Sequence, residues 1–380
     1  MGRSERFWVE FNELFKHHGN TAARSGKEVS YGTTHIRREY LKQDFHRLRT
    51  GKLVKLEGGQ VVSEQRFKLA SPRNLKQKHI RALINDWLAR EYSVPYLHNK
   101  LSVIRVFCGW IGKPNLVPGT AEVIMDPRYR HRSQVAVTDK TWSGCGIDVT
   151  QKIQEIAGTD LRVAMVLDLM RVFSLRQKEA SLLRPHLSDQ KVYLDINRGT
   201  KGGRARTHKI DTPEERAVLD RAKALVTDLE GCLIPKEMSL ERWKNRLYFV
   251  LRKHGVNRKK LGTSTHGLRH EGLNKLYKEI TGAKSPVQGG KPGDVTPETD
   301  RFARQQVAET AGHGKRSSSA AYLGGFLRDK KPTAEVPDPP STPESTDPEN
   351  PEQDDEEEDE EARQLIEELR DQADSEEEIS

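Results

Sequence analysis

Apolar residues recur at helical spacing through most of the first 113 residues. This pattern predicts four helices, over 4–18, 34–51, 76–92 and 95–113. Residues 52–64 alternate instead around the pair Gly58–Gly59, which predicts a small hairpin. In the last helix, Lys100 and Arg105 lie off the apolar stripe. We therefore expect a compact, basic, helical N-terminal domain over 1–125.

A second domain is expected over 146–330. Proline, glycine and polar residues interrupt any period in 126–145, which indicates a linker. Beyond the linker the pattern predicts helices over three stretches, 147–174, 213–229 and 239–254. Two short alternating segments in 191–211 predict a hairpin that turns at Gly202–Gly203, and 283–297 indicates a surface loop. The fold class is therefore mainly α with small β-hairpins (α+β).

The charge of the chain is divided very unevenly. Residues 331–380 hold 21 Asp and Glu against 3 Lys and Arg, together with many prolines and serines, so we expect a disordered acidic tail. Its residues 361–372 could form one marginal helix with Leu365, Ile366 and Leu369 on a single stripe, where an accessory protein could dock. The first 330 residues then carry 61 cations against 35 anions, a net charge of +26.

Such a high positive net charge indicates a polyanionic partner, most simply double-stranded DNA. The cations that we expect to contact it include Lys100, Arg105, Arg204, Arg206 and Lys209. The alternative is an ordinary bundle with solvated charges.

The cysteines and the apolar runs bear on the compartment. Cys108, Cys145 and Cys232 are far apart and form neither a CxxC pair nor a disulfide framework, which suits a reducing interior. No apolar run approaches the roughly 18 residues of a membrane span, and the first residues lack an apolar signal core. We therefore expect a soluble, cytoplasmic protein with no membrane contact.

The stretch AETAGHGKRSSSAAYLGGF (308–326) places His313 nine residues before Tyr322. On one continuous helix nine residues advance about 900°, so the two side chains would face opposite sides. They meet only if the chain turns between them, which Gly314 and the serines of 317–319 could achieve, with a serine capping a new helix. The alternative is a tyrosine that packs into a core.

Breaking a DNA strand without a metal needs a nucleophile, two or more cations on the phosphate oxygens, and a general acid for the leaving oxygen. Residues 174–185 hold Arg176 three positions before Glu179, which could orient the guanidinium or form a surface pair. THGLRHEGL (265–273) holds His266 three before Arg269, with Thr265 placed to cap the helix.

Two further signals have competing interpretations. Lys201 lies at the glycine-rich hairpin tip, where it could swing into a groove or be an ordinary solvated lysine. His266 and His270 have the i, i+4 spacing of a zinc pair, but no Glu lies between them as in HExxH and no cysteine is near. We therefore expect no metal and no cofactor.

In chain order, these residues form a set that resembles the tyrosine recombinases, or phage-type integrases. The matching motifs are SLRQKEASLL, TKGG, HGLRH, and AGH followed nine residues later by tyrosine, over about 145–327. The helices at 76–113 resemble the family's SAM-like core-binding domain. TKGGRAR, the long insert before AGH, and AYLG look closest to a proteobacterial subgroup found on mobile elements.

The resemblance implies a role for each matched position. Tyr322 would attack the phosphate and form a 3′-phosphotyrosyl link, Arg176 and Arg269 would clamp the phosphate, and Lys201 would protonate the leaving 5′ oxygen. His266 and His313 would hydrogen-bond the phosphate and help to move protons.

The resemblance also implies how the protein assembles and acts. Four protomers would assemble on synapsed DNA in a bacterial, nucleoid-associated setting, with 323–329 docking into a neighbour through Leu323, Phe326 and Leu327. Two alternatives are a type IB topoisomerase that relaxes DNA as a monomer, and a DNA-binding factor without catalysis. The acidic tail and the length of the loop at 283–297 depart from the family pattern.

A tethered anionic tail stays at high local concentration and can compete with phosphate for the same cations, or it can simply keep a basic protein soluble. If it competes, truncation after Lys330 tightens binding to non-specific DNA at low salt. The difference in affinity between the truncated and full-length proteins becomes smaller as salt rises, because the Debye length falls to about 8 Å at physiological ionic strength. A salt series of affinities for both proteins measures this. Equal affinities throughout would leave the tail as a solubility device.

Overall fold

The computed structural model describes residues 2–22, 26–57 and 60–326. They fall into two compact units that divide between Ser133 and Gln134, and each is described by itself. The turn glycines Gly58–Gly59, the proposed anchor Leu327 and the acidic tail with its predicted helix lie outside the described residues. Within the described ranges, none of the helices is both long and apolar enough to cross a membrane.

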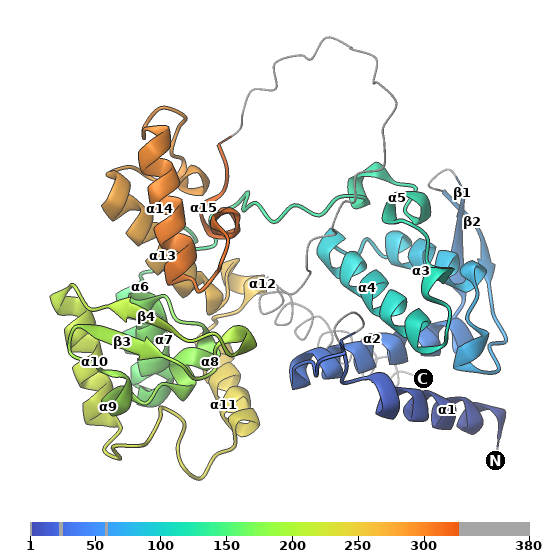
Figure 1. Cartoon of the computed structure of the whole chain (residues 1–380), viewed down its shortest axis with the longest axis horizontal. Coiled ribbons are helices and arrows are strands. Elements are labelled where there is room, and N and C mark those ends of the chain that lie inside the picture. The colour runs from blue at the N-terminus through green and yellow to red at the C-terminus, as the bar shows by residue number, and fades with distance from the viewer. Residues whose placement is uncertain (1, 23–25, 58–59, 327–380) are drawn as a thin grey trace. The chain divides into compact units, whose positions relative to one another are not determined.

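The first unit is a helical bundle with one hairpin at its edge (Figure 1). Its elements are α1 (Arg3–His18), α2 (Tyr31–Thr50), β1 (Leu53–Glu57), β2 (Gln60–Gln65), α3 (Gln77–Ala89), α4 (Val94–Trp110) and α5 (Thr120–Val123). These confirm the four predicted helices and the hairpin, whose strands are antiparallel. α2 begins three residues before the predicted start, because Ser30 accepts a hydrogen bond from the Thr33 amide at 3.2 Å and caps the helix.

Lys100 lies inside this unit, which contradicts its prediction as a DNA contact. Its Nζ lies 2.9 Å from Oδ1 of Asp44, and both side chains are almost fully buried. The rings of Tyr40, Trp87 and Tyr96 surround the ammonium at 5.0–5.4 Å. The buried carboxylate is the reason that a cation occupies the core, because an unpaired charge there would be costly.

Arg105 is also used within the first unit. Its Nη2 donates to the carbonyl of Pro118 at 3.0 Å and to Oγ1 of Thr120 at 3.1 Å. These bonds fasten the segment after α4 to that helix. Burial lowers the pKa of this guanidinium. The side chain is therefore used to hold the structure together, and the expected contact with DNA is not supported.

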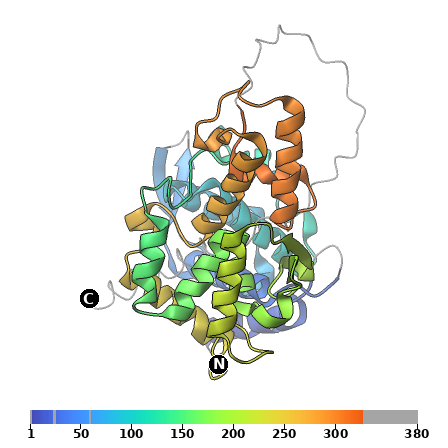
Figure 2. The ribbon, with the colours of Figure 1, turned by 90° about the vertical axis from the view of Figure 1, so that its left-hand side faces the viewer.

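The second unit has helices α13, α14 and α15 gathered on one side and the hairpin with the remaining helices on the other (Figures 1 and 2). Its elements are α6 (Val149–Ala157), α7 (Leu161–Phe173), α8 (Gln177–Leu182), α9 (Pro185–Ser188), β3 (Tyr193–Ile196), η4 (Lys201–Gly203), β4 (Arg206–Lys209), α10 (Pro213–Leu225), α11 (Leu240–Lys253), α12 (Arg258–Leu261), α13 (His266–Thr281), η5 (Pro286–Gln288), α14 (Pro297–Thr310), η6 (Arg316–Ser319) and α15 (Ala320–Leu323). The helices predicted over 147–174 are confirmed as α6 and α7, which are separate because Asp160 caps α7 by accepting from the Arg162 and Val163 amides.

Part of the predicted linker belongs to this unit. Trp142 is fully buried in its core, and its indole N–H donates to the carbonyl of Ser264 at 2.8 Å. Ser143 donates to Oε1 of Glu271 at 2.6 Å. Residues 139–147 thus hold the start of α13, the helix that carries His266 and Arg269. A lone tryptophan among polar residues shows no period, which is why the pattern missed it.

The buried pair predicts a large cost for Lys100→Met. Removing the ammonium leaves Asp44 buried without its cation, and breaking such a pair typically costs about 3–5 kcal/mol. We expect the free energy of unfolding to fall by an amount of this order at pH 7 and by less as the pH is lowered, because burial raises the pKa of Asp44 and so favours the neutral carboxyl. Urea unfolding followed by tryptophan fluorescence measures this. Asp44→Asn added to Lys100→Met is the control and restores part of the loss, whereas no loss in the single variant would contradict the pair's importance.

Candidate active site

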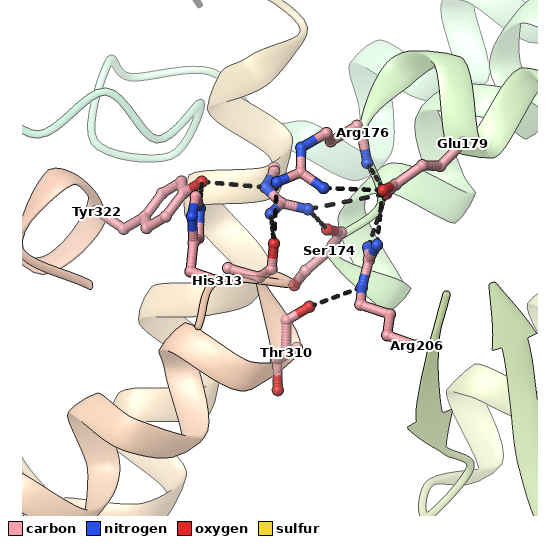
Figure 3. A network of polar contacts seen from close by, with 9 residues as sticks. Ser174, Arg176, Glu179, Arg206, Thr310, His313 and Tyr322 are labelled. Carbon is pink, nitrogen blue, oxygen red and sulfur yellow. Dashed lines mark hydrogen bonds and ion pairs between the residues drawn. The ribbon is translucent and has the colours of Figure 1, made fainter. Parts of the chain in front are cut away.

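The chain does turn between His313 and Tyr322, and it brings the two side chains together. Nε2 of His313 lies 3.1 Å from the hydroxyl oxygen of Tyr322 (Figure 3). α14 ends at Thr310, the His313 amide donates back to the carbonyl of Ala308 at 2.8 Å, and η6 leads into α15. The predicted serine cap is wrong: the Ser319 hydroxyl donates to the carbonyl of Arg316, because the serines form a 3₁₀ turn of their own.

The ring of Tyr322 is packed while its hydroxyl faces polar groups. The residue is 5% exposed and shares a core cluster with Leu273, Tyr277 and Val307. The Arg269 guanidinium lies 5.6 Å from the ring centroid, and its Nε donates to the hydroxyl at 3.4 Å. The alternative of a core tyrosine therefore describes the ring but not the oxygen.

Arg176 and Glu179 form the buried start of α8. Arg176 is the N-cap residue, and its amide donates to Oε2 of Glu179 at 2.8 Å. Its Nη1 donates to Oε1 of the same carboxylate at 2.9 Å. Glu179 is fully buried, so the carboxylate orients the guanidinium and the surface-pair alternative is wrong.

Three arginines converge on this single carboxylate. Besides Arg176, Arg206 donates to both oxygens of Glu179 at 2.6 and 2.7 Å, and Nη1 of Arg269 lies 4.0 Å from it. Burial by itself would raise the pKa of Glu179, but the arginines, Arg206 foremost, lower it to about 2. Three cations around one anion leave an excess of positive charge, so the cluster is suited to binding a further anion such as a phosphate.

The end of α14 supplies the other acceptors for the arginines. The Ala311 carbonyl accepts from Nη2 of Arg176 at 3.1 Å and from Nη2 of Arg269. Arg269, fully buried, also donates to the carbonyl of Ser174. Gly312 has φ of 72°, and a Cβ there would lie 3.2 Å from Cδ of Arg206. The glycine of the AGH motif is therefore favoured by its backbone conformation, and a Cβ there would also crowd the Arg206 side chain.

His266 begins α13 beside the tyrosine. Its ring centroid lies 6.1 Å from that of Tyr322, and the His270 ring lies 4.9 Å from it. Thr265 makes no side-chain cap bond, contrary to the prediction; Oγ of Ser264 accepts from the His266 amide instead, at 3.3 Å. The two histidine rings are 5.1 Å apart, and among the described residues no group of three or more metal-ligating side chains is found.

The hairpin cations differ from one another in exposure. Lys201 is half-buried at the tip, while Arg204 and Lys209 are exposed, with Lys209 paired to Asp211 at 2.6 Å. Arg206, which we predicted as a DNA contact, is turned inward onto Glu179 and the Thr310 carbonyl. Strand alternation could have placed it, since residues 206 and 208 share the inward face and 207 and 209 are exposed. The carbonyls of Ser174 and Ala311 had no signal in the sequence.

Two family models match the chain. The model described as "Integrase" matches residues 131–272, and "Phage integrase, N-terminal" matches residues 52–117. None of the curated proteins matches.

Several solved structures share the fold at low sequence identity. A lambda integrase fragment dimer bound to a core site is 12% identical, with 86% of this chain and 98% of that chain covered and a TM-score of 0.51. A lambda integrase tetramer bound to a Holliday junction is 13% identical, with 84% and 79% covered and a TM-score of 0.51. The Tn1549 transposon integrase in complex with transposon right end DNA is 11% identical, with 84% and 95% covered and a TM-score of 0.50.

The surroundings of His313 predict a pH-dependent stability. Burial, then the charges of Arg269, Arg176, Lys201 and Arg206, lower the pKa of His313 from 6.5 to about 3. Between these values the unfolded chain binds a proton that the folded chain does not, so this residue makes the free energy of unfolding fall as the pH falls below about 6.5.

We expect the Tm difference between wild type and His313→Gln to be constant above about pH 7. Between pH 6.5 and 4.5 the Tm of the wild type should fall relative to that of the variant. Thermal melts across this range measure it. A difference that does not change with pH would mean that the folded imidazole titrates normally.

Proposed function

We propose that Tyr322 is the nucleophile with which this chain, a site-specific DNA recombinase of the tyrosine recombinase family, cuts and rejoins DNA. One observation carries the assignment: the Tyr322 hydroxyl lies beside His313 and Arg269 at the edge of a buried cluster with excess positive charge. A purely structural tyrosine would have no need of such surroundings.

In the proposed cleavage step the Tyr322 oxygen forms a bond to phosphorus, and the bond from phosphorus to the 5′ oxygen breaks. The phenol proton passes to Nε2 of His313, which lies 3.1 Å from the hydroxyl oxygen and is neutral before the step because its pKa is lowered. Lys201 donates a proton to the departing 5′ oxygen. The product is a 3′-phosphotyrosyl link and a free 5′ hydroxyl, and attack by a 5′ hydroxyl reverses the step and reseals the strand.

The arginines stabilise the charge on the non-bridging oxygens in the transition state. Arg176 and Arg269 each use some guanidinium N–H groups on Glu179, Ser174 or Ala311, and each fork carries five donors in total. The bonds already made hold both guanidinium groups in place beside the Tyr322 hydroxyl, where their charge would act on a phosphate. His266, at the N-terminal end of α13, would hydrogen-bond the same phosphate.

The partner that we propose is double-stranded DNA at the ends of a mobile element, which the protein would integrate or excise. The tetramer of lambda integrase on a Holliday junction and the Tn1549 integrase on transposon end DNA support this by fold alone. Four protomers would assemble on synapsed DNA, with Arg204 and Lys209 as exposed phosphate contacts and the acidic tail as a site for accessory proteins. Its place would be the bacterial cytoplasm, at the nucleoid.

Tyr322→Phe should bind DNA as the wild type does and form no covalent adduct, because only the hydroxyl is lost. Nicked suicide substrates that span the ends of the element trap the wild-type adduct, which denaturing gels separate from free protein. Tyr277→Phe is the matched control: it removes a hydroxyl from the same core cluster, where it donates to Asp300 at 2.6 Å, and should still form the adduct. An adduct in Tyr322→Phe would overturn the assignment.

A further inference from the structure

The hairpin that carries Lys201 is held against α8 at a glycine before its tip. Gly199 has φ of 73°, and a Cβ at this position would lie 2.8 Å from the carbonyl oxygen of Lys178 and 3.0 Å from the amide nitrogen of Glu179. Real Cβ atoms do not approach a backbone so closely. Only glycine therefore lets the hairpin lie against the peptide that joins Lys178 to Glu179.

After the tip, Arg206 fastens the second strand to the same place. Its Nη1 and Nη2 donate to the two carboxylate oxygens of Glu179 at 2.6 and 2.7 Å, a two-pronged contact that Figure 3 shows. Its Nε donates to the carbonyl of Thr310 at 3.1 Å. One side chain thus joins β4, α8 and the end of α14, the three elements that meet around the site.

The tip between these two contacts is the single 3₁₀ turn η4, which contains two glycines. Gly202 and Gly203 are exposed and have φ of 62° and 70°. Glycine leaves the backbone free to adopt many conformations, so such a tip is positioned by what holds its ends. Nζ of Lys201 is buried, so its ammonium does not face open solvent.

We propose that Arg206 is a positioning residue for Lys201: together with the close approach at Gly199, its fork onto Glu179 holds the hairpin so that the ammonium reaches the leaving 5′ oxygen. This rests on the proposed function, in which Lys201 is the general acid. It differs from the sequence prediction that Arg206 contacts DNA, and from a role in clamping the phosphate through Arg176. Each of these three roles predicts a different defect.

A substrate with sulfur in place of the bridging 5′ oxygen separates them. A thiol has a pKa near 8.5, so a thiolate leaves without a proton and the general acid is no longer needed. We expect Arg206→Ala to slow cleavage of the ordinary substrate about 10-fold to 100-fold, since a misplacement of about 1 Å can cost roughly 10²-fold. On the sulfur substrate, at saturating DNA, its rate should return to within about threefold of wild type. Single-turnover adduct formation measures both rates.

Two further variants keep the proposal open to refutation. Gly199→Ala displaces the hairpin without changing the charge around Glu179, and it should show the same rescue even if Arg206→Ala is too unstable to study. Arg206→Lys keeps the charge but loses the fork, so it should be slow on the ordinary substrate and rescued by sulfur. Arg198→Ala, an exposed arginine beside the same hairpin, is the matched control and should be unaffected on both substrates.

The outcomes distinguish the inference from the function on which it rests. If Lys201→Ala is rescued by sulfur but Arg206→Ala and Gly199→Ala stay slow, the positioning role is wrong. Arg206 then acts on the phosphate clamp, and Arg176→Ala should likewise stay slow on the sulfur substrate. If Arg206→Ala is at wild-type rate on the ordinary substrate once DNA is saturating, the role is also wrong. If Lys201→Ala itself is not rescued, it is the assignment of the general acid that fails.

Discussion

The carboxylate of Glu179 is the acceptor around which the catalytic unit is arranged. Fully buried, it would be costly to ionise alone, and the three arginines around it would repel one another without it. Together they are stable because every charge is hydrogen-bonded and close to an opposite one. The charges in the cluster do not cancel, because three cations share one anion. That excess makes the cluster suited to binding an anion such as a phosphate, which a charge-balanced ion-pair network would not be.

The C-terminal end of α14 completes the arrangement. Backbone carbonyls at a helix end lack intrahelical partners and carry partial negative charge, so they attract cations. Here the carbonyls of Thr310 and Ala311 accept from all three arginines. Gly312 allows the chain to leave the helix beside Arg206, and His313 follows directly. The same helix end therefore orients the cations and delivers the histidine to the tyrosine.

The N-terminal unit uses cations differently. Lys100 and Arg105 looked like surface charges because they lie off the apolar stripe, yet one is paired with a buried aspartate and the other fastens a following segment. A net charge of +26 over the first 330 residues indicates a polyanionic partner without telling which cations face it. The contacts of each side chain have to be known before it can be assigned to DNA or to the core.

Helical periodicity determined most of the helices, because an amphipathic face is a local property of the sequence. The candidate site residues could also be selected from the sequence, because the motifs that contain them have a specific order and spacing: Arg176, Lys201, His266, Arg269, His313 and Tyr322. Even the turn between His313 and Tyr322 could be deduced, because a continuous helix would have separated them. These predictions needed only neighbours in the chain.

Only the tertiary structure decided where Arg206 points, what Trp142 holds and why Gly199 and Gly312 are glycine. Each depends on a contact between residues far apart in sequence, such as Arg206 with Glu179 or Trp142 with Ser264. A carbonyl oxygen such as that of Ala311 is present at every position of every chain, so nothing in the sequence distinguishes the one that receives two guanidinium groups. Long-range packing creates that distinction, because it alone brings a helix end, a strand and a buried carboxylate to the same place.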